Sequence, residues 1–270
     1  MIDAPAPQPG PVAAGSRAPL VDRRLDGPLL FARFAFPPNR LGLCGPESGQ
    51  TLPDRVRSGR PDAELVHLAR QFEGAYPYLE LIAAANAIAD PLDASVVEAY
   101  WLGNDLLGRV GPRALHDDLT DRFRPRTRPR EWRWLEAKAD GPSAVHHSFH
   151  VLEILPRIGL LRGGLPPDLV GVLERCLVRP ARVVGVGTAV GGSLDVELAP
   201  LELVDGRLRF GPARLTHLPA LNGDGFGDIF LPGDHVAIHW DRVCGRLDPV
   251  QAARLAAVTE RNLAVANTTL

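Results

Sequence analysis

The sequence has 270 residues, of which 45% are hydrophobic and 23% are charged. These are ordinary values for a folded globular protein, and they exclude a disordered or fibrous chain. Thirty basic and 32 acidic residues give a net charge of −2. No overall positive field therefore favours nucleic acid or an anionic membrane surface.

The three cysteines are Cys44, Cys176 and Cys244, and no Cys-x-x-Cys motif occurs. Their odd number and wide spacing argue against a disulfide scaffold and a standalone structural zinc site. A reducing cytoplasm is the expected location.

Residues 1–30 contain six prolines and no apolar run of the length that a signal peptide or membrane anchor needs. We expect these residues to form a disordered tail, and no membrane association.

Residues 31–165 are predicted to form a mainly helical domain. Pro37-Pro38 and the glycines around Cys44 predict an irregular stretch, because proline and glycine disfavour regular elements. Asp62 and Ser95 are predicted N-caps. Apolar spacing predicts helices over residues 63–72, 78–88, 96–110 and 143–161, the last with a kink at Pro156.

Residues 121–134 carry six arginines, two prolines and three aromatic residues. The prolines predict an extended loop. Arginines interleaved with aromatic rings could stack on single-stranded nucleic acid, but a solvated loop or a partner-docking surface is the preferred interpretation. Nucleic acid is not an expected partner.

Residues 166–270 are predicted to form a second domain, with a boundary near residue 165. A short helix opening at Asp168 is followed by valine-rich strands and a hairpin at Asp205-Gly206. A further strand covers residues 236–240, and Asp248-Pro249 starts a long amphipathic helix. The fold class expected is α+β, a helical domain followed by a small antiparallel β unit with a C-terminal helix.

The densest group of potential metal ligands is His146, His147 and His150, three of the eight histidines within five residues. On a helix, spacings of three and four residues place two imidazoles on one face, where they can bind a common metal ion. Cys44 lies in a glycine-flanked loop and is a candidate thiolate ligand or nucleophile. One hypothesis is therefore a metal-dependent enzyme that uses this cluster with Cys44.

Two separated motifs resemble a known family. Residues 176–184 read Cys-Leu-Val-Arg-Pro-Ala-Arg-Val-Val, and residues 232–239 read Pro-Gly-Asp-His-Val-Ala-Ile-His, followed by Leu247-Asp248 before a helix. In order and spacing they are similar to the motifs of the HypC/HupF hydrogenase maturation chaperones. The resemblance covers about residues 175–265.

The resemblance implies a small OB-like β-barrel with a C-terminal helix. It also implies that Cys176 and His239 bind the iron of an Fe(CN)2CO fragment for nickel-iron hydrogenase. The expected partners are the hydrogenase large subunit precursor or other maturation proteins. Four features depart from the family. Cys176 lies far from the initiator methionine, Arg179 replaces an apolar residue, Trp240-Asp241-Arg242 replaces a smaller stretch containing glycine, and residues 222–227 lengthen the middle of the barrel.

The leading hypothesis is a metallocentre assembly accessory that binds iron through Cys176 and His239. Cys44, His146, His147 and His150 would then form a second ligand set. The sequence does not decide between this function and the metal-dependent enzyme, and it identifies no catalytic residue.

Overall fold

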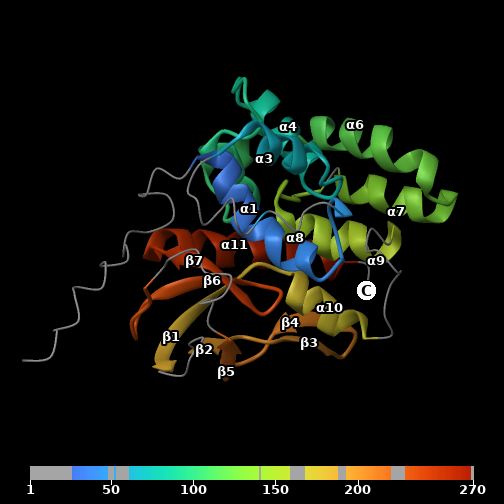
Figure 1. Ribbon diagram of the computed structural model, residues 1–270. Coiled ribbons are helices and arrows are strands. Elements are labelled where there is room, and N and C mark those ends of the chain that lie inside the picture. Colours follow the sequence, from blue (N-terminus) through green and yellow to red (C-terminus); the bar gives the residue numbers. More distant parts are fainter. Residues whose placement is uncertain are drawn as a thin grey trace, which may run out of the picture.

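The computed structural model describes residues 26–47, 52, 61–139, 141–158, 168–187, 193–219 and 229–268. The α+β class is confirmed, with helices first and strands after them (Figure 1). The first helices are α1 (Gly27–Arg40), α3 (Ala63–Arg70), α4 (Tyr76–Ala85), α5 (Ala94–Trp101), η2 (Asp105–Arg109), α6 (Pro112–Phe123), η3 (Arg124–Arg126) and α7 (Pro129–Ala139). They are followed by α8 (His147–Phe149), the π-helical segment η4 (His150–Ile154), α9 (Leu155–Ile158) and α10 (Leu169–Cys176).

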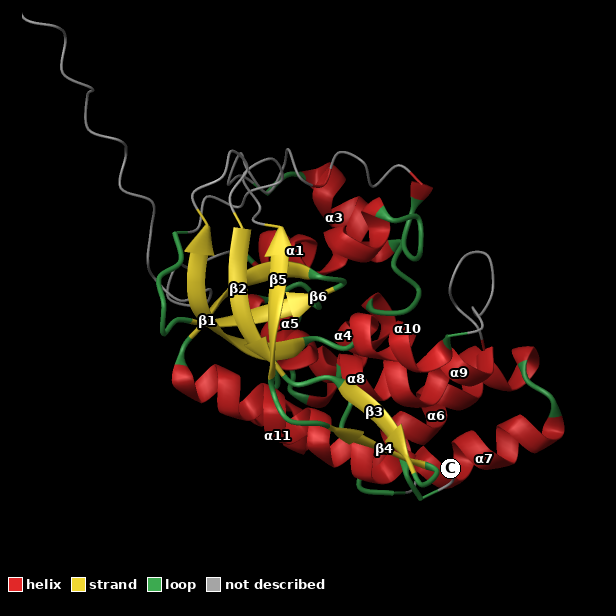
Figure 2. Ribbon diagram, turned by 90° about the horizontal axis from the view of Figure 1, so that it is seen from below, coloured by secondary structure: helices red, strands yellow, loops and turns green. Residues whose placement is uncertain are grey.

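The strands form a five-stranded antiparallel sheet and a separate hairpin. The strands are β1 (Arg179–Gly187), β2 (Ser193–Leu198), β3 (Leu201–Val204), β4 (Arg207–Phe210), β5 (Arg214–Pro219), β6 (His235–His239) and β7 (Arg242–Leu247). The sheet order is β5-β2-β1-β6-β7, and β3 pairs with β4. The sheet is strongly curved (Figure 2), but over the described residues its ladder ends at β5 and β7 without closing into a barrel.

Acidic N-caps begin several of the predicted helices. The side chain of Asp62 accepts a hydrogen bond from the Leu65 N–H, and that of Asp168 accepts one from the Gly171 N–H. Asp248 and Gln251 form a capping box at the start of α11 (Pro249–Ala266). These three helix starts confirm the sequence prediction. The Asp205-Gly206 hairpin is also present, with positive φ at both residues.

The α1 helix corrects two predictions, the tail over residues 1–30 and the irregular stretch that begins at Pro37-Pro38. Residues 1–25 lie outside the described part of the chain, but Gly27 to Leu30 belong to a buried helix and not to a tail. Gly27 approaches the backbone of Leu92 so closely that a Cβ there would lie 1.6 Å from the Leu92 carbonyl oxygen. Burial of this apolar helix overrides the composition that suggested disorder.

Two further helix boundaries differ from those predicted. The α1 helix continues through Pro37 and Pro38 to Arg40, where an irregular stretch was expected. Asp93, and not Ser95, caps α5, which ends at Trp101 because Gly103 follows with a φ of +82°. The chain then resumes as the 3-10 helix η2.

The arginine-rich stretch is mainly helical and is not an extended loop. The η3 helix contains Pro125, and α7 begins at Pro129. Proline is well accommodated in the first turn of a helix, because the N–H groups there have no intrahelical acceptor. The prolines therefore mark helix starts here.

The largest of three hydrophobic clusters among the described residues spans both parts of the chain. Phe34 and Tyr100 belong to the same buried cluster as Cys244 and Leu255. In Figure 1, α11 runs between the helical part and the sheet, and it contacts α8, η4, β1, β6 and β7. The boundary expected near residue 165 lies within 159–167, outside the described residues. No helix in the described ranges has both the length and the apolar character needed to cross a membrane.

Buried Asn262 ties α11 to the segment that precedes α8. Its side-chain amide accepts a hydrogen bond from the Ala144 N–H at 2.9 Å and donates to the Ala144 carbonyl oxygen at 3.1 Å. It also bonds to Ser148 Oγ at 2.9 Å. These contacts satisfy buried backbone groups immediately before His147.

A buried ion cluster lies further along the same helical run. The Glu153 carboxylate, on η4, is fully buried and lies 3.8 Å from both Lys138 Nζ and Arg157 Nη1. Lys138 also donates to the Val265 carbonyl oxygen and to Thr268 Oγ1. The cluster thus joins α7, the π-helical segment and the end of α11.

We predict that Asn262→Ala lowers the free energy of unfolding by roughly 2–4 kcal/mol, because it leaves the buried Ala144 N–H without a partner and removes the amide's bonds to the Ala144 carbonyl and Ser148 Oγ. Urea unfolding followed by circular dichroism measures this change. Glu260→Ala, an exposed change in the same helix, is the control. A loss below about 1 kcal/mol for Asn262→Ala would contradict the role given to this amide.

Stability should also depend on pH through Glu153. Burial raises the pKa of this carboxyl from 4.5 to about 7, more than Lys138 and Arg157 lower it. Between these values the folded chain binds a proton that the unfolded chain has lost. The free energy of unfolding should therefore fall by roughly 3 kcal/mol as the pH rises from 4.5 to 7.

Glu153→Gln should remove this slope, which urea unfolding at a series of pH values would reveal. Glu136→Gln, at a half-exposed position on α7, is the matched control. An unchanged slope in Glu153→Gln would assign the pH dependence to another group.

Candidate metal centre

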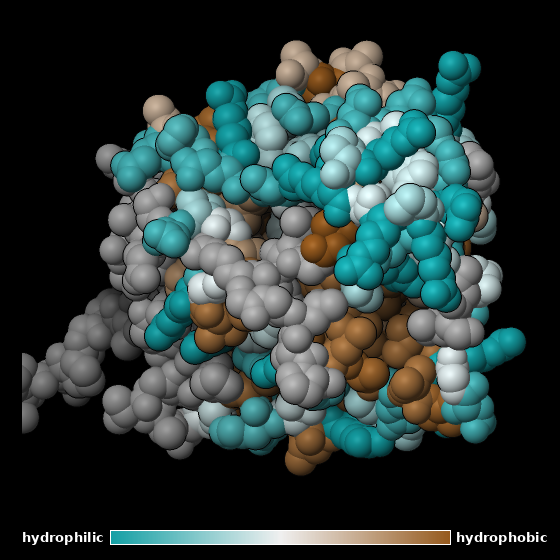
Figure 3. All heavy atoms as spheres, turned by 90° about the vertical axis from the view of Figure 1, so that its right-hand side faces the viewer, coloured by the Kyte–Doolittle hydropathy of each residue, from teal (hydrophilic) through white to brown (hydrophobic). Residues whose placement is uncertain are grey.

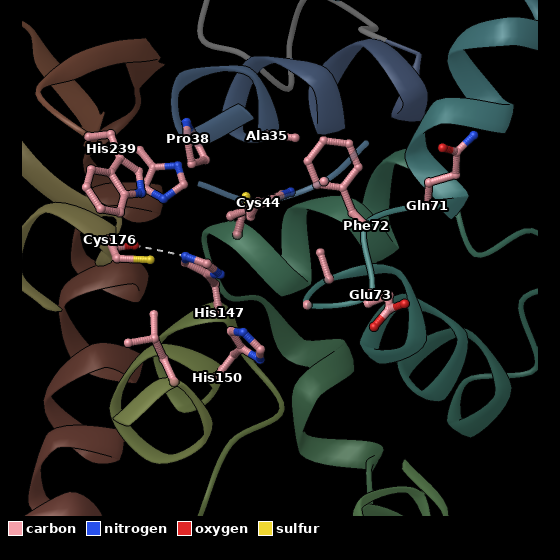
Figure 4. Close-up of a pocket in the computed structure, with 16 residues that line it drawn as sticks. Ala35, Pro38, Cys44, Gln71, Phe72, Glu73, His147, His150, Cys176 and His239 are labelled. Atoms are coloured by element: carbon pink, nitrogen blue, oxygen red, sulfur yellow. Dashed lines mark hydrogen bonds between the residues drawn. The ribbon is translucent and has the colours of Figure 1, made fainter. Parts of the chain in front are cut away.

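Three buried side chains that could bind a metal meet in one cavity. His147 is the first residue of α8, Cys176 the last of α10 and His239 the last of β6. One ligand atom from each lies within 4.8 Å of the other two. Figure 4 shows the three side chains gathered at one side of the cavity, whose volume is about 220 Å³.

The donor set fits a transition-metal ion. Thiolate and imidazole together suit zinc, iron and other borderline or soft metals. An ion about 2.0–2.3 Å from each donor needs donors roughly 3.3–4 Å apart. Small side-chain movements would bring the three residues to that spacing, and the cavity leaves further coordination positions open.

His239 is held by a carbonyl group that a proline leaves available. Pro38 has no N–H, so the Phe34 carbonyl oxygen, four residues earlier in α1, lacks its usual helical donor. His239 Nδ1 lies 2.7 Å from that oxygen and donates to it. In the neutral ring, Nε2 then carries the lone pair, and it has no hydrogen-bond partner among the described residues.

Burial keeps the imidazoles neutral. It lowers the pKa of His239 to about 4, against the opposing effects of the Phe34 and Cys176 carbonyls. It also lowers the pKa of His147 well below the ordinary value, with smaller contributions from His239 and His150. Neutral imidazoles offer a lone pair to a metal without first losing a proton.

His147 lies in a chain of three hydrogen-bond contacts. Its Nε2 is 2.9 Å from the Cys176 carbonyl oxygen, and its Nδ1 is 3.2 Å from the Tyr100 hydroxyl, which donates to the Gly74 carbonyl at 2.8 Å. Three bonds need three hydrogens, but a neutral imidazole and one hydroxyl supply two. One contact in the chain is therefore unsatisfied when the ring is neutral.

A metal ion at His147 Nε2 would replace the Cys176 carbonyl as the partner of that nitrogen. The ring hydrogen would then lie on Nδ1 and be donated to Tyr100, whose own hydrogen remains on the Gly74 carbonyl. Metal-binding histidines usually donate their second ring N–H in this way, which fixes the ring and its tautomer. Tyr100 is thus placed to orient a ligand.

Cys176 supplies the thiol. Burial raises its pKa far above the usual value; the nearby Cys44 adds to the rise, and the Trp240 indole opposes it. The free side chain is therefore a neutral thiol, and a bound metal would replace its proton. Cys176 ends α10, so its carbonyl is free of the helix and accepts from His147.

A two-residue turn in an unusual backbone conformation brings Trp240 to the cavity. Trp240 and Asp241 join β6 to β7 with φ values of 49° and 57°. Such turns usually contain asparagine or glycine, and left-handed φ costs a bulky residue about 1–2 kcal/mol. The Trp240 N–H donates to the Arg175 carbonyl at 2.8 Å, which holds the turn against α10.

Aromatic rings enclose the ligands. The Trp101 ring centroid lies 4.5 Å from that of His147 and 5.6 Å from that of His239. Phe72 and Trp240 also line the cavity. These rings limit the access of water and favour the neutral forms of the ligands.

The structure divides the other predicted ligands. Cys44 and His150 line the same cavity but lie outside the group of three. The His150 ring is 6.4 Å from that of His147, and its Nδ1 has no partner among the described residues. His146 does not line the cavity; its Nδ1 caps α8 by accepting the Ser148 N–H. None of the three cysteines forms a disulfide.

Sequence reasoning missed the residues that support the ligands. Tyr100 and Trp101 fall within the helix predicted over residues 96–110, and no sequence signal set them apart from core residues. Trp240 stood out as a departure from the resembled family. Nothing in the sequence linked Phe34 to His239.

Comparison with known proteins establishes the family but no function. Residues 23–270 match DUF6390, a family of unknown function, and the chain belongs to it. No curated protein and no solved structure matches the chain.

We predict that Tyr100→Phe weakens metal binding by about 10–100-fold, because His147 loses the acceptor for its second ring N–H. Titration with Co²⁺, followed by the absorption of its thiolate complex, measures the affinity. Tyr78→Phe, the same change in the ring stacked on Tyr100, should bind Co²⁺ as the wild type does. Equal affinities for Tyr100→Phe and wild type would show that the hydroxyl does not act on His147.

Proposed function

We propose that this DUF6390 protein binds a transition-metal ion through His147, Cys176 and His239 and acts as an accessory in metallocentre assembly. The observation that carries the proposal is the meeting of these side chains in one buried cavity. Cys176 and His239 are the residues that the resemblance to HypC/HupF chaperones singles out. His147 comes from the histidine cluster of the helical part.

The cargo that we propose is iron, carried as an Fe(CN)2CO-type fragment. Thiolate is a soft, strongly donating ligand that suits such iron, and the imidazoles complete the protein's share of the coordination. A cavity of about 220 Å³ leaves room for small ligands on the metal, since a water molecule occupies about 30 Å³. Its apolar walls suit ligands such as cyanide and carbon monoxide.

The proposed place in the cell is the cytoplasm, where free thiols persist. The proposed partners are the nickel-iron hydrogenase large subunit precursor or other maturation proteins. Cys44 is half-buried in the cavity wall, while Cys176 lies deeper. Cys44 and His150 would then act on the fragment during its arrival or release, and the three ligands would retain it.

A metal-dependent enzyme is the second candidate. The cavity also presents His150, whose Nδ1 has no partner among the described residues, and Cys44. Both line the cavity beside the three ligands, where a substrate would lie. His146 has no part in this candidate, because its imidazole is used to cap α8.

Anaerobic purification, metal analysis and infrared spectroscopy test the proposal. We expect iron together with absorption bands of bound cyanide and carbon monoxide. Cys176→Ala, His147→Ala and His239→Ala should each lose the metal while remaining folded. Cys244→Ala, a buried cysteine outside the site, and His217→Ala, an exposed histidine, should retain it.

The other outcomes separate the two candidates. Wild-type amounts of metal in Cys176→Ala would refute the proposed site. Metal lost from the triad variants without infrared bands in the wild type would favour the metal-dependent enzyme. Metal lost from Cys44→Ala or His150→Ala but retained in His239→Ala would move the site to the other side of the cavity.

A further inference from the structure

A basic groove lies on the outer face of α7, away from the metal cavity. Figure 3 looks onto the side of the molecule that carries α6, α7 and α9, where hydrophilic side chains gather in the upper half. The groove is lined by Arg128, Arg130, Glu131, Arg133, Trp134 and Arg157. Four arginines face one glutamate, so the groove carries a strong local positive charge in a protein whose net charge is −2.

Among the described residues, three of the four groove arginines lack the carboxylate partner that eight other arginines have. Ion pairs with carboxylates neutralise Arg113, Arg122, Arg126, Arg179, Arg182, Arg214, Arg246 and Arg254. Across the described ranges, Arg128, Arg130 and Arg133 have no carboxylate within ion-pair distance, and all three are exposed. Their guanidinium groups are free to bind a ligand.

The charges of Arg128 and Arg130 are also placed unfavourably with respect to the dipole of α7. Arg128 and Arg130 flank the first residue of α7, where the helix dipole already places positive charge and acidic residues are usual. Glu131, the acidic residue of this turn, accepts the Arg128 N–H at 2.9 Å. This local arrangement destabilises the free helix start, and a bound anionic group would relieve it.

Trp134 and Arg157 form the inner wall of the groove. The Arg157 guanidinium lies over the Trp134 ring, and Lys138 Nζ is 5.1 Å from the same ring. Behind them, the single buried carboxylate of Glu153 faces both Lys138 and Arg157. The inner wall therefore contains more positive than negative charge.

We infer that this groove is the docking surface for an acidic segment of a partner protein. Guanidinium groups match carboxylates in geometry, and their spread along α7 suits carboxylates spaced along a peptide. The net charge of −2 gives a long polyanion no overall attraction to the molecule. A short acidic segment needs only the local charge of the groove, which favours protein over nucleic acid.

The surface is distinct from the metal site but connected to it. No residue of the groove lines the metal cavity. One helical run nevertheless extends from His147 through η4 to Arg157, a distance of about 15 Å at the usual helical rise. A partner bound in the groove would lie beside the helix that carries a metal ligand.

A labelled peptide in which glutamate and glycine alternate tests the inference directly. Fluorescence anisotropy with the full-length protein should show binding at low ionic strength that weakens as salt is added. Arg130→Gln/Arg133→Gln should weaken binding by about tenfold. The matched control is Arg207→Gln/Arg209→Gln, which removes the same charge from exposed positions of β4 and should change the affinity by less than about twofold.

Three results would overturn the inference. The first is no binding of the peptide at low salt. The second is an equal loss of peptide affinity in the two double variants. The third is a single-stranded oligonucleotide that binds more tightly than the peptide and depends on Arg130 and Arg133. Metal content in the same preparations reports separately on the proposed metal site. Peptide binding without metal would support the docking surface alone, and metal without peptide binding would support the metal site alone.

Discussion

The hydrogen bond from His239 to the Phe34 carbonyl is the contact on which the candidate site depends. It joins the end of a strand to the first helix across 205 residues of sequence. It exists because Pro38 leaves that carbonyl without its helical donor. The same bond sets the tautomer of His239, so a backbone feature of the helical part determines which nitrogen the sheet presents to the cavity.

The site is therefore a product of tertiary structure. Its three donors end or begin a helix, a second helix and a strand, and neighbouring hydrophobic clusters pack these elements together. Element ends leave backbone groups free, as the Cys176 carbonyl shows, and such groups can fix the side chains around them. The unfolded chain would not hold the three donors together, so metal binding and folding should be coupled.

Local sequence rules located much of the fold. Asp62, Asp168 and Asp248 cap helices as expected, because capping depends on residues three positions apart. Proline was misleading where it was assumed to break helices: Pro38 lies inside one and Pro129 begins another. In both cases burial or position in the first turn decided the outcome.

The site was partly predictable. Motif resemblance pointed to Cys176 and His239, and clustering of histidines pointed to His147. Neither could show that the two sets share one cavity, because their proximity arises from packing between the two parts of the chain. Tyr100 could not have been found at all, since its role depends on a proton count across Gly74, His147 and Cys176.

The π-helical segment at residues 150–154 has a consequence for how this protein can vary. A π turn contains one residue more than the α-helical turn that would replace it, and each residue rotates the helix by about 100°. Deleting a single residue there would convert the π turn into an α-helical turn, and the residues on either side would keep close to their present phase. A deletion elsewhere in this helical run would instead rotate the residues beyond it by about 100° and turn Arg157 away from Trp134. The π-helical segment is therefore the place where this run should best tolerate the loss of one residue.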